Sequence, residues 1–198
     1  MKHLLLLLFC VLIFGCSQET ANKNSTEKPP QIDVSKAATY RVLKTDTKFY
    51  GDKKLITVFI DSPNAKGLDE RAQTIIKAAL EASGSNKAGD TEVLLMPDEK
   101  VVTKSYQYAR ARYLTESAKV SPEQDTWTVD SSDDVFSAKD IETILLYEKN
   151  ADRFTMKDGT TDNNSLNRFV AKQMHIKTED FDLPAAITYS YEPKFKSR

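Results

Sequence analysis

Cysteine is almost missing from this chain, and its two copies, Cys10 and Cys16, both lie near the N-terminus. Cys10 falls inside an apolar segment with the properties of a cleaved signal, so Cys16 is the one cysteine expected in the mature protein. Exported proteins occupy compartments where disulfides persist, yet a single cysteine cannot form an internal disulfide. The sequence therefore excludes thiol catalysis, thiolate metal sites and disulfide exchange from the folded part.

Histidine and glycine are also scarce, with two histidines and six glycines in the chain. His3 lies in the apolar N-terminal segment, which leaves His175 for the folded part. Zinc sites built from histidine and cysteine need several such ligands, which one chain cannot supply here. A catalytic triad would have to use His175, and no G-x-S-x-G sequence accompanies it. Glycine-rich phosphate loops are missing as well. We therefore predict no metal site and no cofactor.

No charge of either sign predominates, since 28 basic and 29 acidic residues give a formal net charge of −1. Loss of residues 1–15 would remove Lys2 and would hardly change this balance. Binding to nucleic acid, or to a membrane surface through a polybasic patch, requires concentrated positive charge. The composition argues against both kinds of partner, and the length suits one soluble domain with its own core.

The longest apolar run extends from Leu4 to Phe14 and follows the basic residue Lys2. A membrane-spanning helix needs roughly 20 apolar residues, whereas the apolar part of a secretion signal needs about 7–15. Polar sequence begins immediately after this region, at Ser17. We therefore predict a secretion signal over residues 1–15.

The residues at the end of this signal, Ile13-Phe14-Gly15-Cys16, resemble the lipobox of bacterial lipoproteins, although Phe14 is bulkier than usual there. The resemblance implies a diacylglyceryl group on the Cys16 sulfur, cleavage after Gly15, and further acylation of the new amine with a chain such as palmitate. Two or three acyl chains make a lasting membrane anchor. Ser17 stands where aspartate signals inner-membrane retention in enteric bacteria, which implies an outer-membrane location facing the periplasm. The alternative is an ordinary cleaved signal with an incidental cysteine.

Residues 16–38 follow as an expected tether that begins at the lipidated Cys16. This stretch has few large apolar side chains and contains Pro29 and Pro30. Such a segment cannot bury enough apolar surface to offset the entropy lost on ordering. We therefore predict a flexible connection with a reach of about 25 Å.

Residues 39–131 have the pattern of an α+β core. Apolar residues recur at helical spacing between Leu68 and Ala82, which predicts one amphipathic helix. Alternating or wholly apolar runs predict five strands, at 39–46, 55–60, 92–96, 104–114 and 126–129. The order is strand, strand, helix, strand, strand, strand, which favours a small antiparallel sheet with the helix on one face.

Residues 132–198 predict a helical C-terminal region packed on this core. Ser137 and Ser165 are expected to cap two helices, with a turn at Asp158-Gly159 between them. Residues 186–191 predict a last short strand. Strands 55–60 and 92–96 are apolar on both faces, so the second face of the sheet needs a cover, which this region can supply.

The globular part has a faint resemblance of its own, carried by Tyr40, the helix at 68–82, the strand at 92–96 and the run YQYARARY at 106–113. These features look like a small bacterial α+β domain family of unknown function. The resemblance covers about half of the mature chain and has no diagnostic motif. It implies a fold and carries no activity to transfer.

Tyr106, Tyr108, Arg110 and Arg112 are spaced by two and are the strongest candidate binding residues. On a strand, residues with this spacing share one face. Aromatic rings beside guanidinium groups can stack on and pair with a sugar, a peptide or a phosphate-bearing ligand. The alternative is a half-exposed sheet face whose tyrosines and arginines pack across strands.

Two further groups of side chains are weaker candidates. Arg168, Lys172 and His175 would share one face of the second C-terminal helix, where they could meet an anion or simply be solvated. Two acidic stretches gather carboxylates without the spacing of a calcium-binding EF-hand, and turns favour such residues for local reasons. These carboxylates are Asp130, Asp133, Asp134, Asp158 and Asp162.

The sequence thus favours a lipid-anchored envelope protein whose domain binds or scaffolds an envelope protein or a cell-wall partner. Two alternatives remain open at this stage. One is a cell-envelope hydrolase that uses carboxylate chemistry, for which the sequence nominates no pair of residues. The other is an exclusion or immunity lipoprotein that blocks an incoming phage, plasmid or toxin.

Overall fold

The computed structural model describes residues 31–198 apart from positions 52, 87–88, 104 and 197–198. The predicted signal, Cys16 and the predicted tether as far as Pro30 lie outside the described residues. The described residues belong to one compact unit that begins at Gln31. Within that unit, no described helix is both long enough and apolar enough to cross a membrane.

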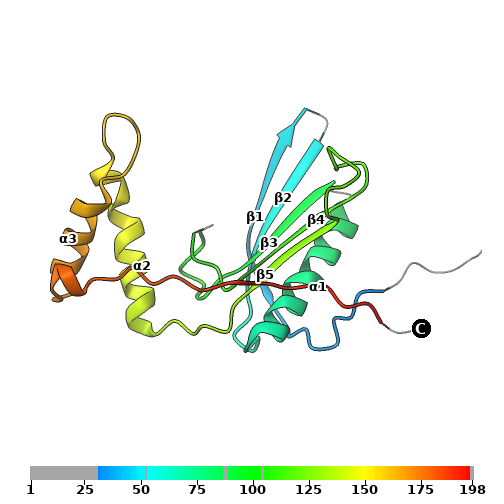
Figure 1. Ribbon diagram of the computed structural model, residues 1–198, viewed down its shortest axis with the longest axis horizontal. Coiled ribbons are helices and arrows are strands. Elements are labelled where there is room, and N and C mark those ends of the chain that lie inside the picture. The colour runs from blue at the N-terminus through cyan, green and yellow to red at the C-terminus, as the bar shows by residue number, and fades with distance from the viewer. Residues whose placement is uncertain (1–30, 52, 87–88, 104, 197–198) are drawn as a thin grey trace, which may run out of the picture. The chain divides into compact units, whose positions relative to one another are not determined.

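The fold is α+β, as the sequence predicts, and its sheet has six strands in the order β1-β2-β3-β4-β5-β6 (Figure 1). The predicted order of strand, strand, helix, strand, strand, strand is confirmed. The elements of the sheet and its helix are β1 (Arg41–Tyr50), β2 (Lys53–Asp61), α1 (Leu68–Asn86), β3 (Asp90–Leu95), β4 (Ala109–Leu114), β5 (Trp127–Ser131) and β6 (Tyr189–Ser190). The remaining elements are α2 (Ala138–Asn150), η1 (Ala151–Phe154), α3 (Asn163–Gln173) and η2 (Thr178–Asp180).

One neighbouring pair departs from the expected antiparallel arrangement, because β2 and β3 run parallel, with Leu55 opposite Asp90 and Ile60 opposite Leu95. The other pairs in the sheet are antiparallel. The reason is the helix between them: α1 carries the chain back along the sheet, so β3 starts at the same end as β2. The carboxyl ends of β2 and β3 and the N-terminus of α1 therefore meet at one edge of the sheet.

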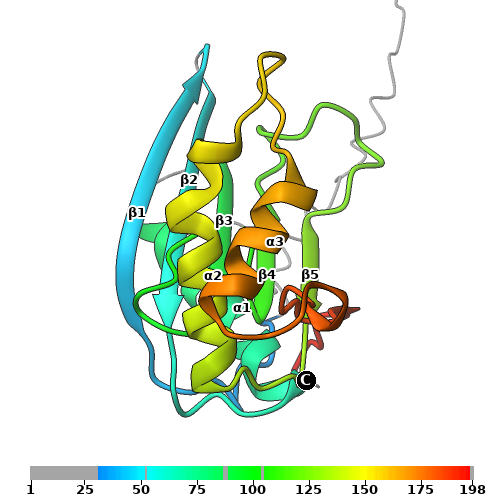
Figure 2. The same ribbon diagram turned by 90° about the vertical axis from the view of Figure 1, so that its left-hand side faces the viewer.

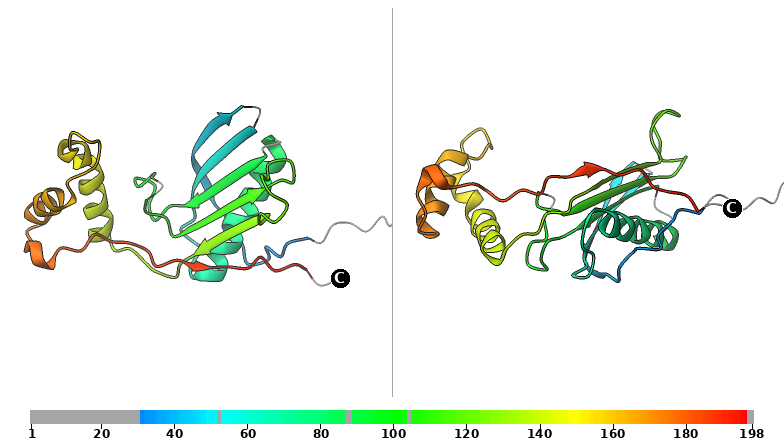
Figure 3. Two further views of the ribbon diagram at one scale, coloured as in Figure 1. Left: turned by 45° about the horizontal axis from the view of Figure 1, so that its top comes forward. Right: turned by 60° about the horizontal axis from the view of Figure 1, so that its bottom comes forward.

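Helix α1 covers one face of the sheet and forms the main core with it (Figure 3). Its side chains at Ala72, Ile75, Ile76 and Ala79 recur at helical spacing and are fully buried. Each large apolar side chain buried in this way stabilises the fold by roughly 1.5–3 kcal/mol. The strand residues that meet them are Ile56, Val58, Ile60, Val93, Leu95, Ala109, Ala111 and Val129.

The opposite face of the sheet has a smaller apolar cluster of Phe59, Leu94 and Met96. Its partners are Leu43 of β1 and Val102 of the connection between β3 and β4. The cover for this face thus comes from a loop within the predicted core. Among the described residues, the C-terminal third, which the sequence nominates for this role, contributes no side chain to this cluster.

Helix α2 packs on that same connection, where Val101, Tyr106 and Ile144 form a third buried cluster. Figure 2 shows α2 and α3 side by side, and the two helices contact each other. The rings of Phe154 and Phe169 join η1 to α3, with centroids 5.6 Å apart. Helices α2 and α3 are therefore attached to the core through a loop, whereas the end of the same C-terminal region joins the sheet itself through β6.

The predicted caps of these two helices have different outcomes. Ser137 caps α2 in a full capping box, in which its side chain and that of Asp140 each accept a backbone N–H of the other. Helix α3 is capped by Asp162, whose side chain accepts the Ser165 backbone N–H at 3.0 Å. The prediction of Ser165 as the cap is wrong, because aspartate three positions earlier is an equally good cap and starts the helix sooner.

The segment just before β1 packs against the core, although it falls within the predicted tether. Val34 and Ala38 are partly buried against the main core. The backbone N–H of Lys36 donates to Gln73 Oε1 at 2.7 Å, and that of Ala38 donates to Thr74 Oγ1 at 2.9 Å. Two polar side chains of α1 thus hold this segment along the helix.

Candidate functional site

A pocket of about 440 Å³ lies at the edge where β2 and β3 end and α1 begins. In sheets with parallel strands, ligands bind beyond the carboxyl ends of those strands. We call this cavity the Arg71 pocket. Its wall includes Ala65, Lys66, Arg71, Met96, Tyr108 and Phe136.

Arg71 is the most unusual residue of the wall, because it is a charged side chain with only 3% of its surface exposed. Its Nε donates to the Ala65 carbonyl at 3.2 Å, and its Nη1 donates to the Ser132 carbonyl at 2.6 Å. Among the residues that the structure describes, Arg71 forms no ion pair with a carboxylate. Burial lowers the pKa of Arg71, and this effect is opposed by nearby Tyr108, Asp133 and Asp134. An arginine stays protonated nonetheless, so the wall carries a buried positive charge.

Tyr108 forms the surface on which Arg71 lies. Its hydroxyl oxygen accepts the Phe136 backbone N–H at 2.7 Å, and the two rings pack with centroids 5.2 Å apart. Burial raises the pKa of Tyr108, so its phenol is neutral near pH 7. One of the four predicted binding residues therefore lines the pocket, as a fixed aromatic wall.

Tyr106 has a different role from Tyr108. Strand β4 begins at Ala109, and Tyr106, three residues earlier, packs against Ile144 of α2. Tyr106 is buried against Val101 and Ile144, and this burial raises the pKa of its hydroxyl. The two tyrosines and two arginines therefore do not share one face.

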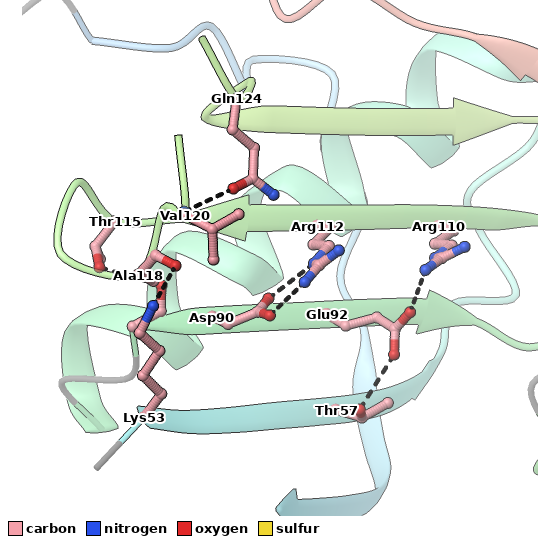
Figure 4. A network of polar contacts seen from close by, with 11 residues as sticks. Lys53, Thr57, Asp90, Glu92, Arg110, Arg112, Thr115, Ala118, Val120 and Gln124 are labelled. Carbon is pink, nitrogen blue, oxygen red and sulfur yellow. Dashed lines mark hydrogen bonds and ion pairs between the residues drawn. The ribbon is translucent and has the colours of Figure 1, made fainter. Parts of the chain in front are cut away.

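Arg110 and Arg112 do lie together, on the face of β4 that points away from α1 (Figure 4). Arg110 Nη2 lies 2.7 Å from Glu92 Oε1 on β3, and Glu92 also accepts a hydrogen bond from Thr57 of β2 at 3.2 Å. Arg112 forms two hydrogen bonds with Asp90, at 3.0 and 2.6 Å. Each arginine thus pairs with a carboxylate on the next strand, which matches the structural alternative for these residues.

Arg168, Lys172 and His175 do not form the predicted helical face. Helix α3 ends at Gln173, and His175 follows with φ of 55° in the left-handed region. The Ile176 backbone N–H then donates to the Ala171 carbonyl, which closes the end of the helix. The prediction fails because the helix ends at Gln173, two residues before His175.

Three of the five carboxylates in the acidic stretches have structural roles. Asp134 accepts hydrogen bonds from Ser132 Oγ and from the Ile187 backbone N–H. Asp158 accepts from Thr160 within a turn, and Asp162 caps α3. No group of three or more possible metal-ligating side chains is found in the described part of the chain.

The sequence reasoning missed Arg71, although a signal was present. Arg71 stands three residues after Leu68 and four before Ile75, which places a cation within the apolar stripe of the predicted helix. A charged residue on a buried stripe needs a polar partner or a ligand.

Comparisons with known proteins support the fold and assign it no activity. No curated protein matches this chain. A crystal structure of a DUF487 family protein from Desulfovibrio piger is similar at 19% sequence identity and a TM-score of 0.60. The match covers 79% of this chain and 96% of that one. At this level of identity, the similarity supports the fold alone. The model of a family described as a domain of unknown function (DUF4875) matches residues 35–187, and the chain therefore belongs to that family.

Proposed function

We propose that this chain is a lipid-anchored protein of the cell envelope whose α+β domain binds a small ligand in the Arg71 pocket without transforming it. The anchor is proposed at Cys16, on the strength of the lipobox-like residues before it. By the same resemblance, we propose the outer membrane as its location. The binding role is carried by one observation, which is a pocket of ligand-binding size whose wall includes a buried cation beside apolar side chains.

The contacts of the polar groups in the wall favour binding over catalysis. Nucleophilic catalysis needs a nucleophile within hydrogen-bonding distance of a base. The Ser62 hydroxyl instead donates to the Thr39 carbonyl at 2.7 Å. The Asp61 carboxylate accepts from Arg41 at 3.1 Å. These groups hold the rim of the pocket in place, which suits a preformed binding site.

Two matched variants test this proposal. Val135 lines the pocket and is 80% exposed, whereas Val120 is 84% exposed in the connection between β4 and β5 and is not part of the pocket wall. Val135→Trp places a large side chain at the mouth of the pocket, and Val120→Trp adds the same side chain elsewhere. Neither change removes a buried group, so both proteins should fold.

The measurement is mass spectrometry of small molecules released by denaturing each full-length protein after purification from host membranes in mild detergent. We expect the wild-type protein and Val120→Trp to release the same compound, and Val135→Trp to have lost it. Release of that compound by Val135→Trp in equal amount would contradict the proposal. So would the absence of any released compound from the wild-type protein.

A further inference from the structure

The chemistry of the pocket wall identifies the class of ligand, and this step rests on the proposed binding function. A guanidinium group has five N–H donors in a planar arrangement. In Arg71, the Nε donor and one Nη1 donor are directed to the carbonyls of Ala65 and Ser132. No hydrogen bond joins Nη2 to any residue that the structure describes. Adjacent N–H groups of the Nη1 and Nη2 atoms match the two oxygens of a carboxylate or a phosphate.

Asp133 and Asp134 act on Arg71 from nearby without pairing with it, and the direct contacts of Arg71 point the same way. Its two acceptors are neutral backbone carbonyls, so they satisfy hydrogen bonds without neutralising the cation. A buried cation without a contacting anion is unfavourable, and an incoming anion removes part of that penalty. The carboxylate of Asp61 in the pocket wall is already bonded to Arg41. Lys66 adds a second positive charge to the wall.

The position of α1 adds to the positive electrostatic potential at the pocket wall. The helix is 19 residues long, and its N-terminus adjoins the pocket through Gly67. The N-terminus of a helix has a partial positive charge that favours anions. This effect alone would not define a site, but here it coincides with a buried guanidinium in the same wall.

The remaining wall is apolar. Met96, Pro97 and Phe136 lie in the lining together with Ala65. A small inorganic anion would not fill the apolar part of the pocket. A molecule with an aromatic or aliphatic body fills the space and excludes water from the ion pair, which strengthens it.

We propose that the Arg71 pocket binds a small organic molecule that carries an anionic oxygen group, a carboxylate or a phosphate, on an apolar body. Arg71 pairs with the anionic group, and Phe136 and Met96 contact the body. Tyr108 holds the guanidinium in place through its ring, 4.0 Å away.

The first test uses the wild-type full-length protein in mild detergent and a matched set of probes. Benzoate and phenyl phosphate carry an anion on an aromatic ring, whereas benzamide has the same ring without charge. Binding is measured by ligand-observed NMR titration. We expect at least one of the two anions to bind about tenfold or more tightly than benzamide, because hydrogen bonds to a charged partner are the stronger ones. The comparison of benzoate with phenyl phosphate distinguishes a carboxylate ligand from a phosphate ligand.

The second test uses Arg71→Lys, which keeps the charge and removes the planar pair of donors, with Arg168→Met as a control on α3. We expect Arg71→Lys to weaken anion binding about tenfold, while Arg168→Met binds as the wild type does. The wild-type comparison of benzoate and benzamide stands even if Arg71→Lys does not fold.

Two results would overturn the inference. If benzamide binds as tightly as both anions, the ligand is not recognised by its charge, although the pocket remains a binding site. If neither anion binds to the wild-type protein, the assigned ligand class is wrong. The proposed binding function is tested by a separate experiment, the comparison of compounds released by Val135→Trp and Val120→Trp.

Discussion

The guanidinium carbon of Arg71 lies 4.0 Å from the centre of the Tyr108 ring, which joins α1 to the residue just before β4. Both residues are also tied to the segment that follows β5. Arg71 donates to the Ser132 carbonyl, and the Tyr108 hydroxyl accepts the Phe136 N–H. These contacts therefore connect α1, the residue before β4 and the segment after β5 at the rim of the pocket.

Tyr108→Phe should lower the free energy of unfolding by about 1 kcal/mol, because it leaves the partly buried Phe136 N–H without its acceptor. Tyr108→Leu should lower it by about 2–4 kcal/mol, since the ring beneath Arg71 is lost as well. Urea denaturation measures both values. Tyr189→Phe, at an exposed tyrosine of β6, is the control and should change little. Equal destabilisation by the Phe and Leu variants of Tyr108 would show that its ring contributes nothing.

Arg110→Ala should destabilise the protein more than Arg112→Ala. The side chain of Glu92 is 7% exposed and that of Asp90 is 17% exposed, so Arg110 pairs with the more deeply buried of the two carboxylates. We expect about 1–2 kcal/mol for Arg110→Ala and less than about 1 kcal/mol for Arg112→Ala, because the arginines themselves are partly solvated. Urea denaturation at two salt concentrations checks the order. The reverse order would mean that the two hydrogen bonds of Arg112 outweigh the burial of Glu92.

The caps of the C-terminal helices give a matched set of variants. Ser137→Ala and Asp162→Ala should each lower the free energy of unfolding by about 1 kcal/mol, because each removes an acceptor for a backbone N–H at a helix start. Ser165→Ala should have little effect, since its backbone N–H still donates to Asp162. Thermal unfolding followed by circular dichroism compares the three. If Ser165→Ala lowers the free energy of unfolding as much as Asp162→Ala does, Asp162 is not the residue that caps α3.

Cys16→Ser should abolish lipidation and leave either unprocessed precursor or a soluble form. The reason is that the serine hydroxyl cannot take the place of the thiol that receives the diacylglyceryl group in lipoproteins. Metabolic labelling with a fatty-acid analogue measures the outcome, and Cys10→Ser is the control that should keep the label. Incorporation of label into the Cys16→Ser protein would refute the proposed anchor.

Two deletions of equal length test where the folded unit begins. Removal of residues 31–38 should lower the melting temperature by several degrees, because Val34, Ala38 and the hydrogen bonds to α1 are lost. Removal of residues 17–24 should leave it unchanged, because that stretch has few apolar side chains to pack. If both deletions have the same effect, the contacts of residues 31–38 do not contribute to stability.

Periodic patterns in the sequence determined most of the elements of this fold. The stripe of Ala72, Ile75, Ile76 and Ala79 predicted α1, and the apolar runs at 55–60 and 92–96 predicted β2 and β3. Ser137 marked the start of α2 correctly. These features are local, because a helix or strand face is set by residues a few positions apart.

Tertiary structure decided the features that depend on distant residues. The parallel pairing of β2 and β3 follows from the return of α1 across the sheet, which residue spacing within either strand does not specify. Tyr106 does not share a face with Arg110, because it packs in a buried cluster with Ile144, which is distant in the sequence. The Arg71 pocket has the same origin. Its wall joins residues after β2, after β3 and before α2, and only the folded chain brings a cation, an aromatic ring and an apolar surface around one space.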